Sequence, residues 1–375
     1  MDWNAWRDEF PILSRKTYLN SCSLGALGRR AQSLAATFQD EWSTWGAAAW
    51  YEIWMSRLAE LRRRVAGLLG AAEAEVALEP STSVALAAIA SALDYRRRPR
   101  IVVSELDFPT LAYQWMVRTD AEVVSVPSDD GTTIDPQRFA DAVDERTSLL
   151  ATSHVFFTTG AIQDLRTLAD IAHARGALLL VDAYQSAGQV PIDVRRDDVD
   201  ILTTGPLKWL LGGPGLAYLY VREALWTTLR PSMAGWFGAR EQFEFDISRF
   251  EFKEDARRFE LGTPALPSVH FALGGQEVID AIGVHAIRER NRMLTERLVA
   301  GAEAAGLRMR HAADPEARSA IVMIADADPA GAVAHLATCG IIVDWRPGFV
   351  RVSPHFYNTE DEMDQVVREL VTWRG

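Results

Sequence analysis

Short apolar runs alternate with helix-like stretches between residues 75 and 221, and this alternation constrains the fold more than any other feature of the sequence. Near-continuous apolar runs are typical of strands that are buried on both faces. Strands that alternate with helices predict an α/β protein with a doubly wound, mostly parallel sheet. The runs cover residues 76–78, 101–103, 123–126, 149–152, 177–181, 201–203 and 216–220, which predicts seven strands.

The C-terminal third has a different pattern. A long helical pattern extends from about residue 267 to 306. Thr359 and Glu362 have the spacing of a capping box, which predicts the start of a last helix. These elements predict a smaller α+β domain, and a chain of 375 residues is long enough for two domains at about 150 residues each. The remaining patterns predict strands at 319–324, 341–343 and 349–352 and a helix near 330–339.

Composition excludes several classes of partner. The 39 basic and 51 acidic residues give a net charge of −12, which argues against a nucleic-acid or anionic-membrane binder, since either needs a basic face. Two cysteines, Cys22 and Cys339, are too few for a disulfide framework or a Cys-based zinc site, so we expect no metal. Neither a long apolar run nor a secretory pattern is present, and we expect a cytoplasmic protein.

Lysine is rare in this sequence. Only Lys16, Lys208 and Lys253 are lysines, so 39 − 3 = 36 of the basic residues are arginines. A lysine can lose its proton and attack a carbonyl, whereas arginine stays protonated, although a biased genome would give the same count. Lys208 follows a predicted strand in an apolar, glycine-rich segment, where burial lowers a lysine pKa. A surface lysine is the alternative for Lys208.

Two further segments follow predicted strands. Asp182 comes directly after a very apolar run and is predicted either to cap a helix or to hold a cation. Ser81, Thr82 and Ser83 lie between a strand and a helix, where hydroxyls and backbone N–H groups either cap the helix or bind a phosphate. An anion site, a carboxylate and a desolvated lysine at one sheet edge match the needs of pyridoxal 5′-phosphate (PLP), whose aldehyde forms a Schiff base with a lysine.

The sequence resembles the fold-type-I PLP enzymes of the class V aminotransferase group, which includes cysteine desulfurases, isopenicillin N epimerase-like proteins and kynureninases. The resemblance is carried by Asp182 and Lys208 with their flanks, by the segment 18–25 and by the segment 350–359. It implies that Arg351 binds a substrate α-carboxylate, a role suited to a bidentate donor. It also implies an N-terminal segment (1–20) that packs with the small domain, a large PLP-binding domain (21–260) and a small C-terminal domain (261–375).

Several details resemble kynureninases in particular. Phe108 matches a phenylalanine that stacks on the cofactor ring, and Trp236 lies in a loop like one that packs on an aromatic substrate. Thr263 matches a threonine that reaches the cofactor phosphate of the neighbouring subunit, which implies a homodimer with shared active sites. Gln185 departs from kynureninases and resembles the desulfurase glutamine. The mobile-loop cysteine that takes up sulfur in desulfurases is missing between residues 343 and 351.

Motifs and resemblance together predict an enzyme that acts on an amino acid through a Lys208 Schiff base. The expected reaction is cleavage on the β side, as a kynureninase-like hydrolase or a C–S lyase. The alternatives are a class V aminotransferase or epimerase and, from another class, a catalytically silent cofactor-binding protein. The predicted catalytic residue is Lys208, the other cofactor-binding residues are Thr82, Ser83, Phe108, Asp182, Gln185, Thr204 and Thr263, and the substrate-binding residues are Arg351, Trp236 and Phe157.

Overall fold

A seven-stranded sheet forms the centre of the computed structural model, which describes residues 2–375. Its strand order is β2-β8-β7-β6-β5-β3-β4, and every neighbouring pair is parallel except the two that involve β8. The predicted α/β class and mostly parallel seven-stranded sheet are confirmed. The strands are β2 (Val76–Glu79), β3 (Arg100–Ser104), β4 (Glu122–Val126), β5 (Thr147–Ser153), β6 (Leu178–Asp182), β7 (Ile201–Thr204) and β8 (Ala217–Val221).

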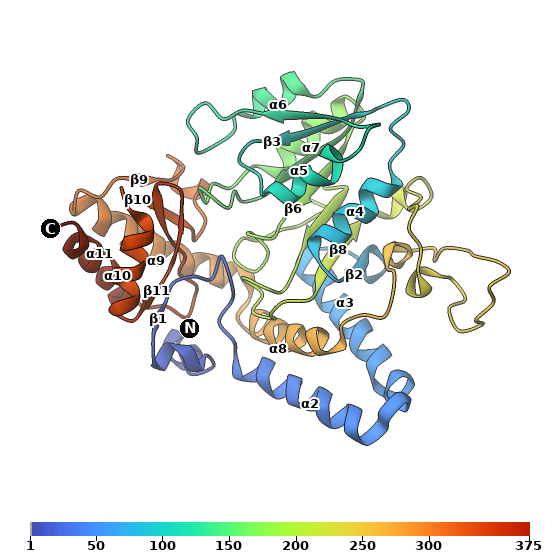
Figure 1. Cartoon of the computed structure of the whole chain (residues 1–375), viewed down its shortest axis with the longest axis horizontal. Coiled ribbons are helices and arrows are strands. Elements are labelled where there is room, and N and C mark those ends of the chain that lie inside the picture. The colour runs from blue at the N-terminus through green and yellow to red at the C-terminus, as the bar shows by residue number, and fades with distance from the viewer. Residues whose placement is uncertain (1) are drawn as a thin grey trace.

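Helices cover both faces of this sheet, which explains why its strands are apolar throughout (Figure 1). Alternate residues of one strand pack into different cores: Ile101 packs with α4 (Thr82–Ala92) and α5 (Pro109–Met116), whereas Val102 packs on the opposite side. The helices on that opposite side are α2 (Arg29–Trp45), α3 (Met55–Leu69), α6 (Pro136–Ala142), α7 (Leu165–Ala174) and α8 (Leu266–Ile282).

A second, antiparallel sheet lies in the smaller lobe at the left of Figure 1, with strand order β12-β13-β10-β9. Its strands are β9 (Met309–Arg310), β10 (Val322–Ala325), β12 (Asp344–Arg346) and β13 (Phe349–Val352). Leucines and valines of three helices complete a separate core there. The helices are α9 (Val284–Ala304), α10 (Pro329–Thr338) and α11 (Glu360–Arg374), the last of which begins with the predicted Thr359–Glu362 capping box.

The N-terminal segment joins this smaller lobe. After a short helix, α1 (Trp3–Arg7), the strand β1 (Thr17–Tyr18) pairs in parallel with β11 (Ile341–Ile342). By contrast, α8 packs against α2, beside the large sheet. We propose domain boundaries at residues 20 and 260. The helix α8 lies after residue 260 but packs with the large lobe.

Two expectations about helices and strands were wrong. The single helical pattern predicted over 267–306 is two helices, because Gly283 has φ +84° and breaks the backbone path between α8 and α9. The strand predicted from 319 begins only at Val322. No helix among residues 2–375 is long and apolar enough to cross a bilayer.

Candidate active site

A cavity of about 270 Å³ lies at the edge of the large sheet where β2, β3, β5, β6 and β7 end. All five strands run in the same direction, since β8 is antiparallel to both β2 and β7, so their carboxyl ends meet at this edge. Seven of the predicted site residues line the cavity. They are Thr82, Ser83, Phe108, Phe157, Asp182, Gln185 and Lys208.

Lys208 lies in the cavity wall, four residues after the end of β7. Burial lowers the pKa of its amine to about 8, although the negative charges of Cys22 and Asp182, when ionised, act in the opposite direction. The amine lies 4.8 Å from the ring centre of Tyr184. Lys208 is therefore a desolvated lysine whose amine is partly neutral near pH 8, and it is not the surface lysine of the alternative interpretation.

The backbone around Lys208 is held by a close contact with the N-terminal segment. Gly25 donates its N–H to the carbonyl of Leu207 at 2.9 Å. A Cβ atom at position 25 would lie 2.1 Å from the carbonyl oxygen of Lys208, so only glycine fits there. This contact gives a physical reason for the glycine at the end of the segment 18–25.

Asp182 is the last residue of β6 and is 7% exposed. One of its carboxylate oxygens accepts a hydrogen bond from the N–H of Tyr184 at 2.9 Å, as a capping side chain does. Burial raises the pKa of Asp182, and neither that hydrogen bond nor Lys208 fully offsets the effect. A cation placed in the cavity beside Asp182 would stabilise its charged form.

The N-terminus of α4 provides the third part of the cavity wall. Ser81 caps the helix by accepting a hydrogen bond from the N–H of Val84 at 3.3 Å, and the first turn carries no acidic side chain. The hydroxyl of Thr82 is buried and has no hydrogen-bond partner. An anion at this position would accept hydrogen bonds from the Thr82 hydroxyl and from the free N–H groups at the helix end.

Two phenylalanines form the aromatic part of the wall. Phe108 precedes α5 and meets Phe157 edge-to-face, with the ring centres 5.2 Å apart. Phe108 is 45% exposed, so its ring faces open space on one side. The preceding residue, Asp107, accepts hydrogen bonds from the backbone of Ser104 and Ser153, and so ties the ends of β3 and β5 together below Phe108.

Arg351 lies beside the cavity on β13 and is 1% exposed. Its guanidinium donates to Asp344 at 2.8 Å, to the hydroxyl of Ser23 at 2.7 Å and to the carbonyl of Phe157 at 3.1 Å. The Nε–H of Arg351 is buried without a partner. We call Arg351, Asp344, Ser23 and the Phe157 carbonyl the guanidinium clamp.

Comparison with known proteins identifies the family. Residues 50–366 match the family model described as Aminotransferase class-V. The chain belongs to this family. It is 35% identical to the uncharacterized aminotransferase YcbU of Bacillus subtilis, over 97% of this chain and 96% of that protein. It is 29% identical to the kynureninase of Geobacillus thermodenitrificans, over 97% and 89% of the two chains.

Two solved structures share the fold of this class V protein. The apo cysteine desulfurase of Thermococcus onnurineus superposes with a TM-score of 0.88 at 21% identity, over 96% of this chain and 95% of that one. The cystine C-S lyase C-DES superposes with a TM-score of 0.88 at 20% identity, over 96% and 99%. At these identities the likeness establishes the fold, which is the predicted PLP fold type I.

The protein is an enzyme of the class V aminotransferase family, and its cofactor is PLP. The cavity suits that cofactor. The Thr82 hydroxyl at a helix N-terminus has no partner and fits a phosphate. The buried carboxylate of Asp182, whose pKa is raised, fits a protonated ring nitrogen. The desolvated amine of Lys208 fits an aldehyde.

Four predicted residues do not line this cavity: Arg351, which lies beside it, and Thr204, Thr263 and Trp236. The hydroxyl of Thr204 donates to the carbonyl of Ala183 at 3.1 Å and is buried behind the wall. Thr263 lies in an irregular segment before α8. Trp236 faces a separate cavity formed by its own loop, residues 239–251, where its ring N–H donates to the carbonyl of Gln242.

Sequence reasoning missed the residues that hold the predicted ones in place. The amide of Gln185 donates to the carbonyl of Cys22 at 3.1 Å and accepts from the ring N–H of Trp209 at 2.9 Å. Trp209 also packs edge-to-face on His355, with the ring centres 5.2 Å apart. Asp344 and Ser23 of the guanidinium clamp were missed as well. The signal available for Trp209 was its position next to Lys208, whereas nothing in the sequence paired Ser23 with Arg351.

Proposed function

We propose that this enzyme uses PLP to break a bond on the β side of an amino-acid substrate, either by hydrolysis of a carbon–carbon bond or by elimination across a carbon–sulfur bond. The observation that carries the proposal is the aromatic pair of Phe108 and Phe157 in the same cavity wall as Lys208 and Asp182. The Phe157 ring, which Phe108 contacts edge-to-face, offers an apolar surface for a substrate side chain beside the reactive amine.

We assign the cofactor contacts from the cavity. Lys208 would bond to the aldehyde carbon of PLP, and Asp182 would pair with its ring nitrogen. Thr82 and Ser83 would bind the phosphate at the α4 N-terminus, and Phe108 would stack on the ring. Thr204 acts as a support, because its hydroxyl fixes the backbone directly after Asp182 through the Ala183 carbonyl.

The chemical roles of the protein groups follow from their electrostatics. When bound, PLP supplies a ring that withdraws electrons from the substrate Cα. The carboxylate of Asp182 favours the protonated ring nitrogen on which that withdrawal depends. The Lys208 amine accepts the Cα proton, and its pKa of about 8 leaves a usable neutral fraction at mildly alkaline pH.

Substrate recognition involves the guanidinium clamp. Arg351 is held by Asp344 and Ser23, and its free Nε–H offers a buried donor to a substrate carboxylate. Both Asp344 and a substrate carboxylate are anions that compete for one guanidinium. In the free enzyme, Asp344 therefore holds Arg351 in position. A substrate carboxylate must carry its full negative charge to compete with Asp344 for the guanidinium.

Sulfur transfer through a protein persulfide is not part of the proposal. Cys22 and Cys339 are the only cysteines of the sequence. Cys22 is 1% exposed, and Cys339 lies at the end of α10 against Glu369 of the small lobe. Neither lies on an exposed loop between Val343 and Arg351, where the resemblance to desulfurases would place the sulfur acceptor.

The reaction is tested by supplying amino acids with aromatic γ-carbonyl side chains, cysteine S-conjugates and simple amino acids, and by identifying the products. Hydrolysis adds one water and yields alanine plus a carboxylic acid. Elimination across the C–S bond yields a thiol, and hydrolysis then gives pyruvate and ammonium. Either product set supports the proposal. A 2-oxo acid with an intact side chain, or a D-amino acid, as the dominant product would overturn it in favour of transamination or epimerisation.

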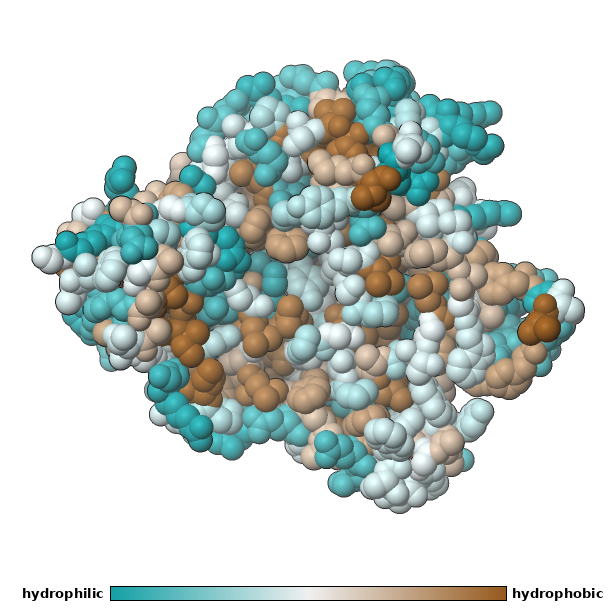
Figure 2. All heavy atoms as spheres, viewed as in Figure 1, coloured by the Kyte–Doolittle hydropathy of each residue, from teal (hydrophilic) through white to brown (hydrophobic). Residues whose placement is uncertain are grey.

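We further propose a homodimer with shared active sites. The loop after β8 exposes a cluster of apolar side chains at the right of the view in Figure 2, and a surface of this kind is typical of a protein interface. The cluster comprises Trp236, Phe243, Phe245, Ile247 and Phe250. Trp236 and Thr263 lie outside the cavity of their own chain, so the proposal places them at the site of the partner.

Mixing an inactive variant with an impaired one tests the shared site. Lys208→Ala and Thr263→Ala chains are denatured together and refolded. If Thr263 serves the partner, the mixed dimer contains one site with both native residues and regains activity above that of either variant. If activity stays at the level of the variants alone, or if the wild type is monomeric by light scattering, the shared-site proposal is wrong. The cytoplasmic location remains a prediction.

A further inference from the structure

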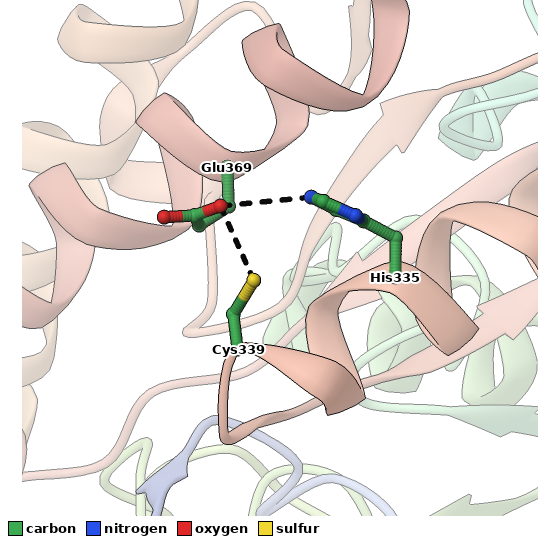
Figure 3. A group of neighbouring side chains, drawn as sticks. All are labelled: His335, Cys339 and Glu369. Atoms are coloured by element: carbon green, nitrogen blue, oxygen red, sulfur yellow. Dashed lines mark hydrogen bonds and ion pairs between the residues drawn. The ribbon is translucent and has the colours of Figure 1, made fainter.

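Three side chains that can bind a metal converge in the small lobe, far along the chain from the cavity residues of the large sheet. His335 and Cys339 lie one helical turn apart at the end of α10, and Glu369 comes from α11 (Figure 3). Their donor atoms all lie within 4.8 Å of one another. Among residues 2–375 this is the one such group of three or more His, Cys, Asp or Glu side chains.

The distances within this group are close to those of a metal site. The Sγ of Cys339 lies 3.3 Å from Oε2 of Glu369, and Nε2 of His335 lies 3.5 Å from the same oxygen. Ligand atoms around a tetrahedral zinc ion, with bonds of about 2.0–2.3 Å, are roughly 3.5 Å apart. All three donors therefore reach one ion after small side-chain movements.

Local packing keeps the imidazole in place. The ring of His335 packs on Trp373 with a centroid separation of 5.8 Å. The buried Nε2 of His335 makes no hydrogen bond and faces Glu369 at the ion-pair distance of 3.5 Å (Figure 3). The three side chains are partly exposed, so an ion can enter from solvent and keep a water as its fourth ligand. A buried ring nitrogen that makes no hydrogen bond and lies beside a thiol and a carboxylate is the second observation that points to a ligand, besides the clustering itself.

We propose that His335, Cys339 and Glu369 form a zinc site that cross-links α10 to α11. A thiolate, an imidazole and a carboxylate in one tetrahedral set are ligands that zinc accepts together, whereas calcium and magnesium prefer oxygen alone. This proposal departs from the expectation of no metal, which rested on the small number of cysteines. It is independent of the proposed reaction and does not rest on it.

The position of the site gives it a structural role. Cys339 ends α10, and the chain continues through β11, which pairs with β1, to β12 and β13, which carry Asp344 and Arg351. An ion bound here fixes the start of the segment that leads to the guanidinium clamp. Because it binds the folded protein, it also raises the temperature of unfolding.

The test uses the PLP-loaded enzyme, freed of metal with a chelator and titrated with zinc chloride and, separately, cobalt chloride. We expect one zinc per chain by elemental analysis and calorimetry. Cobalt should give the ligand-field absorption of a tetrahedral site, at wavelengths beyond the absorption of the cofactor. Zinc should also slow the alkylation of one thiol and raise the melting temperature.

Variants separate the site from incidental binding. Cys339→Ser, His335→Ala and Glu369→Gln should each lower zinc affinity by more than about 10-fold, since even the loss of a residue that only supports a ligand costs 10–100-fold. Cys22→Ser and His311→Ala are matched controls, because they replace a cysteine and a histidine that lie outside the group. Both variants should bind zinc as the wild type does. Binding below one equivalent, or affinity unchanged in Cys339→Ser, would overturn the proposal.

Discussion

The cofactor cavity and the guanidinium clamp are adjacent, but the chain builds them in different ways. The cavity is made from residues 81–208, which follow five strands of one sheet. The clamp draws Ser23 from the N-terminal segment, the Phe157 carbonyl from the large lobe, and Asp344 and Arg351 from the small lobe. The cavity is therefore a property of one sheet edge, whereas the clamp exists only while the two lobes and the N-terminal segment stay packed together.

This difference divides the expected effects of mutations. Changes in the cavity should alter cofactor attachment and the chemical step. Changes in the clamp should alter substrate affinity while the cofactor stays bound.

The largest effect is expected from Lys208→Ala. Loss of the amine removes both the covalent link to PLP and the base for the Cα proton, and we expect kcat to fall by about 10³-fold or more. The variant should also lack the absorption of covalently bound cofactor. Lys16→Ala is the control, because Lys16 lies near the surface after the 3₁₀ turn at Pro11–Ser14, and its activity should equal that of the wild type. Near-normal turnover in Lys208→Ala would remove the basis of the cavity assignment.

Arg351→Lys addresses the clamp. A lysine keeps the charge but not the fork geometry, and it leaves Asp344 with a mobile partner, so we expect KM to rise by about 10–100-fold. The cofactor spectrum and the cofactor affinity should not change. If the variant loses its cofactor while KM for the remaining activity is normal, the two regions are not separable as described.

Thr82→Val tests the phosphate end of the cavity. The buried hydroxyl has no partner within the protein, so its loss should cost little stability but should weaken PLP binding by about 10-fold, the value of one hydrogen bond to a charged group. Thr204→Val is the matched comparison, because its hydroxyl already serves the Ala183 carbonyl. Fluorescence titration of the apoprotein measures both, and a larger loss of PLP affinity in Thr204→Val would reverse the assignment.

The protonation of Lys208 predicts how cofactor attachment depends on pH. Burial lowers the amine pKa to about 8, and only the neutral amine attacks an aldehyde. The rate of attachment to the apoprotein should therefore rise by about 10-fold between pH 7 and pH 9 and level off above, as expected for a midpoint near 8. Stopped-flow absorbance follows this rate. A midpoint above pH 10, as for an exposed lysine, would contradict the burial that we describe.

The contrast between the cavity and the guanidinium clamp also explains which site residues the sequence could predict. Each strand of the large sheet is a short apolar run, and the polar residues that follow it fall at the cavity edge, so the strand pattern was enough to place Thr82, Asp182 and Lys208 together. Arg351 was predicted only by resemblance to a family. Its partner Ser23 lies 328 residues away along the chain, and no local pattern records such a contact. Asp344 is only 7 residues from Arg351 and faces it across the pairing of β12 with β13.

The break at Gly283 and the proposed zinc site are two further features that a local sequence pattern does not predict. The apolar period continues across Gly283, so the pattern alone favoured one helix, whereas the backbone turns there. His335 and Cys339 have a helical spacing that the sequence displays, but Glu369 joins them only because α11 packs on α10.

The central claim is that the Lys208 amine is the one bonded to the cofactor, and borohydride reduction of the holoenzyme followed by peptide mass spectrometry tests it most directly. Reduction makes the link permanent, and the sequence has three lysines to choose from. The account predicts the phosphopyridoxyl mass on the peptide that contains Lys208 and on no other. The mass on Lys16 or Lys253, or on no lysine at all, would contradict it.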